Sequence, residues 1–164
     1  MGQRTQTIIR LTDKKANTTT IHVYHDQWGI GRISPIKLMS TLSMFLLKDD
    51  LSTAYRKDDD ISKYFLDYQS TDDLHSLLGI YSHCDNNNGG IVVDLIREEH
   101  GHIYGKYAFV LGCEDAAGEQ PYTRLLSIEE WLKRTHGQDA AGDIDFINWW
   151  NAFCRWYELE PVID

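Results

Sequence analysis

The pattern that most constrains the fold is a pair of strand-like runs joined by a short polar turn, and it occurs twice. Residues 5–12 (TQTIIRLT) and 18–25 (TTTIHVYH) are rich in β-branched side chains and flank the turn DKKAN. Residues 90–98 (GIVVDLIRE) and 102–112 (HIYGKYAFVLG) flank the turn EHG in the same way. Such runs are typical of β-hairpins. Together they predict an antiparallel sheet of about four strands.

Helical periodicity occupies much of the remaining sequence. Ser34 and Pro35 suit the start of a helix, and the apolar side chains after them fall on one stripe. The same three- and four-residue spacing predicts two helices between residues 58 and 84, and a capping box at Ser127 predicts a helix over 128–135. The stripe of the first helix consists of Leu38, Met39, Leu42, Phe45 and Leu46.

The last predicted helix, IDFINWWNAFCRWYELE over residues 144–160, completes the pattern. A short extended run, YTRLL, lies before the 128–135 helix. Hairpins and helices in this order predict a single α+β domain over residues 1–164, with the helices packed on the sheet.

The charge of the chain is distributed unevenly. Residues 1–48 hold seven Lys or Arg against two Asp, a net charge of +5, and residues 49–164 hold nine against twenty-three, a net charge of −14, which together give −9. An acidic chain of this kind argues against direct binding of nucleic-acid phosphates. No run approaches the roughly 20 apolar residues of a membrane span. Three cysteines without a CxxC pair, and no signal peptide, predict a cytoplasmic protein with reduced thiols.

The segment IHVYHDQWGIGR, residues 21–32, is the best candidate for a small-ligand site. Glycines here permit close approach of a ligand, Trp28 offers a flat apolar face, and Arg32 a planar fork for an anion. With Tyr24 and His25 these residues would hold an anionic, nucleotide-like molecule. The segment matches neither GxGxxG nor a P-loop, and the simpler interpretation is a strand that leaves the sheet through a glycine corner.

Two histidine patterns suggest metal binding, but neither is convincing. His22 and His25 point to opposite faces if they lie on a strand. Glu98, His100 and His102 alternate as a metal site would require, yet they lie at a predicted hairpin tip, where polar residues are expected in any case. A metal-dependent hydrolase built on these histidines is therefore the last alternative. No catalytic residue, metal ligand or cofactor is predicted.

Two further features suggest a protein partner. Asp58, Asp59 and Asp60 belong to an acidic stretch that could complement a basic surface, although a solvated helix face explains them equally well. The last helix carries three tryptophans in an aromatic stripe. Packing in the core is the first explanation of such a stripe, and a protein interface is the second. The interface hypothesis assigns Trp149 and Trp156 to a partner protein or to the seam of a homodimer.

Three segments resemble parts of small uncharacterised proteins of bacteriophages and mobile elements: YHDQWGIGR after the first hairpin, DNNNGG before the second, and FVLGCED followed by SIEEWL. The resemblance defines no enzyme family, so no catalytic residue is carried over. It implies an accessory protein that inhibits or redirects a host protein. The leading hypothesis is accordingly a non-enzymatic binding protein, with the small-ligand site as the alternative.

Overall fold

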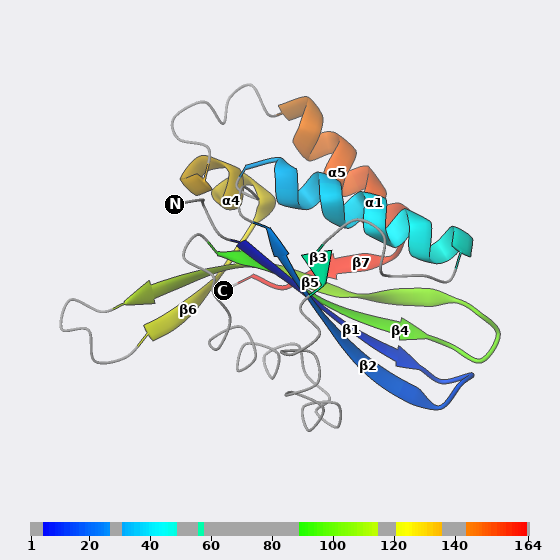
Figure 1. Cartoon of the computed structure of the whole chain (residues 1–164). Coiled ribbons are helices and arrows are strands. Elements are labelled where there is room, and N and C mark those ends of the chain that lie inside the picture. Colours follow the sequence, from blue (N-terminus) through cyan, green and yellow to red (C-terminus); the bar gives the residue numbers. More distant parts are fainter. Residues whose placement is uncertain are drawn as a thin grey trace.

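The computed structural model describes residues 5–26, 31–48, 56–57, 89–114, 121–135 and 144–163. The acidic residues Asp58, Asp59 and Asp60, and the two helices predicted between residues 58 and 84, lie outside the described residues. Within the described part the chain is an α+β fold, in which one sheet carries helices on one face (Figure 1).

The sheet is larger than predicted, and it is mixed rather than antiparallel. Its order in the described residues is β3-β2-β1-β4-β5-β6, with β7 paired to β5. The two predicted hairpins are present as β1–β2 and β4–β5. The seven strands are β1 (Thr5–Asp13), β2 (Thr18–Asp26), β3 (Arg56–Lys57), β4 (Gly90–Arg97), β5 (Ile103–Glu114), β6 (Pro121–Leu126) and β7 (Leu159–Pro161).

The prediction of an all-antiparallel sheet fails at the junction of the two hairpins. The first strands of the two hairpins, β1 and β4, are neighbours in the sheet, and they run parallel to each other. The parallel direction comes from how the two hairpins are placed against each other, since either hairpin alone would allow both directions. Strand patterns within one hairpin carry no information about this long-range pairing, so the sequence did not predict it.

Three ion pairs cross the parallel junction with the same sequence separation of 84 residues. Arg10 holds Asp94 through two hydrogen bonds, Nε to Oδ1 at 3.0 Å and Nη2 to Oδ2 at 2.7 Å. Arg97 donates to Asp13 at 3.1 Å, and Lys14 donates to Glu98 at 2.9 Å. A slip of one residue between β1 and β4 would break all three pairs, so they specify the register of the junction.

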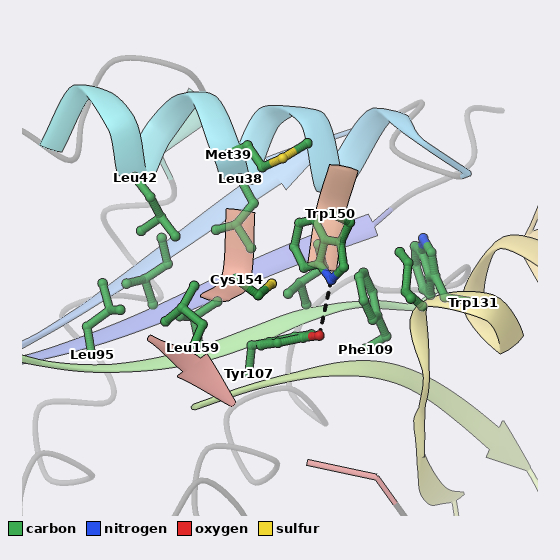
Figure 2. Packing of buried hydrophobic residues seen from close by; sticks show 14 of the residues in the cluster. Leu38, Met39, Leu42, Leu95, Tyr107, Phe109, Trp131, Trp150, Cys154 and Leu159 are labelled. Carbon is green, nitrogen blue, oxygen red and sulfur yellow. Dashed lines mark hydrogen bonds between the residues drawn. The ribbon is translucent and has the colours of Figure 1, made fainter. Parts of the chain in front are cut away.

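Among the described residues, three helices cover one face of the sheet: α1 (Ile33–Lys48), α4 (Ile128–Thr135) and α5 (Ile144–Trp156). The main core lies between them and the sheet, where α1 side chains meet α5 and the strands (Figure 2). Leu38, Met39, Leu42 and Phe45 of the predicted stripe on α1 are buried, and the side chain of Leu46 lies outside the described residues. Ser127 caps α4 as predicted, because the Glu130 amide donates to the Ser127 hydroxyl at 3.1 Å, which is one of the two bonds of a capping box.

Two indole N–H groups fix the helix layer to its surroundings. Trp150 of α5 donates to the hydroxyl of Tyr107 on β5 at 3.1 Å (Figure 2). Trp131 of α4 donates to the carbonyl of Gly31, just before α1, at 3.0 Å. Both tryptophans are fully buried, so each bond satisfies a polar atom that would otherwise be desolvated without a partner.

Replacement of Asp94 by alanine should lower the free energy of unfolding by about 3 kcal/mol. The Arg10 side chain is only 2% exposed, and the substitution would leave its guanidinium buried without its carboxylate. Urea denaturation followed by circular dichroism measures the loss. Glu98→Gln is the matched control on the same junction, because its pair with Lys14 is exposed and should change stability little. Equal losses in the two variants would contradict a special role for the buried pair.

Candidate partner-binding surface on helices α1 and α5

Helix α5 has two aromatic faces, one in the core and one in solvent. Phe146 and Trp150 are buried, whereas Trp149 and Trp156 are 56% and 82% exposed. The two exposed tryptophans are seven residues apart, so they lie on the same face of the helix, two turns or about 10.5 Å apart along its axis. Ala152, also exposed, lies between them and leaves room beside each ring.

Helix α1 runs beside α5 in the same direction. The guanidinium of Arg32, just before α1, stacks on the ring of Phe146 at 5.5 Å from its centroid. At the other end, the hydroxyls of Ser43 and Tyr157 are 3.5 Å apart. The two contact points are eleven residues apart along each segment, from 32 to 43 beside α1 and from 146 to 157 beside α5. The helices are therefore parallel and in register along this length.

This register brings exposed apolar side chains of the two helices to the same level. Ile36 lies four residues after Arg32, and Trp149 three residues after Phe146, so the two residues are at nearly equal heights. Ile36 is 44% exposed, close to the exposed fraction of Ile33 one turn earlier. We call the exposed apolar residues on this side of the two helices the α1/α5 surface; it consists of Ile33, Ile36, Trp149 and Trp156. Ile144 is exposed as well, but it lies five residues before Trp149 and points about 140° away around α5.

The prediction that the aromatic stripe packs in the core is correct for four of its residues and wrong for Trp149 and Trp156, which are exposed. Phe146 and Trp150 belong to the core, and Phe153 and Tyr157 pack against it. The isoleucines of the α1/α5 surface were missed, because an apolar helix gives no indication of which of its residues stay uncovered. Only the arrangement of α1 beside α5 shows which ones these are.

The predicted ligand site around residues 24–32 is only partly described. Tyr24 is fully buried in the main core, because it pairs with Thr7 on the sheet face beneath the helices. Its ring is therefore closed to a ligand at the surface, which corrects that part of the hypothesis. Arg32 stacks on Phe146, as described above. Trp28 and the side chain of His25 lie outside the described residues, so the site as a whole stays a prediction.

The residues of the histidine patterns make local contacts, and the rings of His100 and His102 meet edge to face with their centroids 6.0 Å apart. Glu98 accepts hydrogen bonds from Lys14 and from the Tyr104 hydroxyl, the latter at 2.7 Å, and these bonds lower the pKa of its carboxyl group. The imidazole of His102 contacts the carboxylate of Glu158. His22 contacts the Thr20 hydroxyl. Its position on β2 pairs through Ile9 with Val93 on β4, which lies four residues, or about 13 Å, before the end of that strand, where Glu98 follows.

Among the described residues, no group of three histidine, cysteine, aspartate or glutamate side chains is arranged to hold a metal ion. The metal-dependent hydrolase therefore gains no support from this part of the chain. The thiol of Cys154 is a poor candidate for a nucleophile, because burial raises its pKa to about 12 and keeps it protonated.

A small crevice lies in the main core beneath α1, with a volume of about 10 Å³. A space of this size admits about one water molecule and no organic ligand. Its lining is apolar and comes from Leu42, Phe45, Leu95, Ile103, Tyr157 and Leu159.

Comparisons with protein-family models, curated proteins and solved structures found no match for this chain. No helix in the described part of the chain is long and apolar enough to cross a membrane.

Stability measurements should separate the two faces of α5. Trp150→Ala should lower the free energy of unfolding by about 3–5 kcal/mol, because it empties a fully buried site and removes the bond to Tyr107. Trp156→Ala, the matched control six residues later, should change it by no more than about 0.5 kcal/mol. Thermal and urea denaturation of both variants measures the difference, and a large loss for Trp156→Ala would show that this ring is part of the core.

Proposed function

We propose that this chain is a non-enzymatic binding protein that engages a partner protein through the α1/α5 surface. The observation that carries the proposal is the exposure of Trp149 and Trp156 on one helix face, at 56% and 82%. Large aromatic side chains are costly to leave in water and dominate the binding energy of protein interfaces. Exposed apolar residues of two helices, gathered on one surface, are typical of interaction sites.

The architecture beneath the surface supports a binding role. Phe146 and Trp150 hold α5 on the sheet, so the exposed tryptophans project from a helix that is already fixed before a partner arrives. A pre-ordered surface loses less conformational entropy on binding than a flexible one. The resemblance to accessory proteins of phages and mobile elements suggests the biological role: inhibition or redirection of a host protein.

Photo-crosslinking in the host cytoplasm tests the proposal. A chain carrying p-benzoyl-phenylalanine in place of Trp156 should form one discrete adduct with a host protein. The same photoreactive residue in place of Ala16, exposed in the β1–β2 turn, is the control and should not form that adduct. The adduct is identified by mass spectrometry of the crosslinked band.

A second substitution ties the adduct to the surface. Trp149→Ala, added to the photoreactive chain, should weaken partner binding by at least 2 kcal/mol, or about 30-fold in Kd, and so reduce the yield of the adduct. The absence of any adduct from position 156, or the same adducts from positions 156 and 16, would contradict the proposal.

A further inference from the structure

We infer that the face of the sheet opposite the three described helices is a second buried core, and that residues 61–81 cover it with the apolar sides of the two helices that the sequence predicts there. This face lies on the other side of the sheet from the α1/α5 surface, so the proposed function and the second core can fail separately. Three observations support the second core: the burial of the face, the course of the chain between β3 and β4, and the apolar pattern of the stretch that joins them.

The strands turn a set of apolar side chains away from the described helices. Since side chains alternate along a strand, Ile8 points to the face opposite that of Ile9, which belongs to the main core. Val23 on β2 and Val92 on β4 lie beside Ile8 in the sheet, and Ala108 on β5 lies beside Val92. We call this side of the sheet the second face; its apolar residues are Ile8, Ile21, Val23, Val92, Ala108, Val110 and Leu125.

The second face is as thoroughly buried as the first. Its seven apolar residues are at most 4% exposed, although none of them belongs to the main core. The side chain of Arg10, on the same face, is 2% exposed. A sheet face that is closed to solvent in this way packs against another layer of the structure. All three helices of the described part lie on the first face (Figure 1), so the layer on the second face comes from other residues of the chain.

The course of the chain assigns this layer to residues 58–88, which join β3 to β4. The two strands run parallel, with β2 and β1 between them, so their connection has to cross one face of the sheet. Lys57 is level with Ile91 through Tyr24 and Thr7, and the two ends of the connection are three strand spacings, or about 14 Å, apart. Because α1 packs against β1 and β4 on the first face, the route across these strands is the second face.

The dimensions of the second face fit a pair of helices. Its buried part spans four strand spacings from β2 to β6, about 19 Å, and about 13 Å along β1 from Gln6 to Arg10. Two helices of about ten residues, placed side by side, are each about 15 Å long and about 10 Å wide. The 31 residues from 58 to 88 are long enough for such a pair, and every other stretch outside the described residues has eight residues or fewer.

The sequence of this stretch supplies two apolar sides. In each predicted helix four apolar residues recur at intervals of three and four, which gathers them on one side of the helix. They are Ile61, Tyr64, Phe65 and Tyr68 in the first helix, and Leu74, Leu77, Leu78 and Tyr81 in the second.

Nuclear Overhauser contacts between methyl groups and aromatic rings test the inference in the full, unsubstituted chain. The methyl groups of Ile8 and Val92 should show contacts to the ring protons of the four aromatic residues of the two predicted helices. Ile9 and Val93 are the matched controls, because each is the next residue on the same strand but points into the main core. Their methyl groups should show no contact to those four rings. The four rings are Tyr64, Phe65, Tyr68 and Tyr81.

Two leucine variants test the same layer through stability. Leu77→Ala removes a residue of the apolar side and should lower the urea midpoint of unfolding by about 1 M. Leu66→Ala is the matched control, because Leu66 points about 160° away from Tyr64 and Tyr68 around the predicted helix. It should lower the midpoint by less than about 0.3 M.

The contrary outcomes are distinct. If Ile8 and Val92 show no contact to any of the four rings, the assignment of residues 61–81 to the second face is overturned. Contacts that appear only between labelled and unlabelled chains would overturn it too, and would assign the second face to a second copy of the chain. Equal midpoint shifts for Leu77→Ala and Leu66→Ala would contradict the predicted apolar sides. Photo-crosslinking at position 156 reports on the α1/α5 surface alone, so its failure would leave the second core standing.

Discussion

The parallel junction between β1 and β4 is the constraint on which the rest of the structure depends. It joins two hairpins that each need a neighbour, because an isolated two-stranded hairpin is marginally stable at best. The ion pairs Arg10–Asp94, Arg97–Asp13 and Lys14–Glu98 repeat at one sequence separation and specify a single register. The continuous sheet formed in this way is wide enough to support α1, α4 and α5 together (Figure 1).

The helix layer divides its aromatic residues between the core and the exposed surface. On the inner side, Trp150 bonds to Tyr107 and contacts Phe109, which anchors α5 on β5. On the outer side, Trp149 and Trp156 remain in solvent. Since consecutive residues of a helix differ by about 100° in direction, adjacent tryptophans at 149 and 150 necessarily belong to different surroundings. The rigid inner contacts hold the outer rings at a defined spacing, which is what a recognition surface requires.

Local patterns in the sequence predicted local structure well. The two hairpins, the N-cap of α4 at Ser127 and the buried stripe of α1 follow from periodicity and turn chemistry, and the structure confirms them. The sequence failed where distant segments meet. It did not predict the parallel junction, and it extended the last helix through ELE, where Glu158 instead adopts a positive φ of 50° and Leu159 starts β7 beside Gly105.

The candidate site also combines residues that the sequence could identify with contacts between distant segments that it could not. The sequence identified Trp149 and Trp156 as candidates, but periodicity could not separate core from surface, because that depends on which flank of α5 meets α1. Ile33 and Ile36 join the surface only through the register of the two helices. Tyr24, assigned to a ligand site on its polar surroundings, is instead a core residue.

The central claim is that a partner covers the exposed tryptophans of α5 in the cell. Hydroxyl-radical footprinting with mass spectrometry measures this directly, by comparing oxidation of individual residues in the purified chain and in intact cells. Trp149 and Trp156 should be oxidised readily in the purified chain and be protected in cells, while Tyr104, half-buried on β5, should react equally in both. Equal oxidation of Trp149 and Trp156 in the two samples would contradict the account.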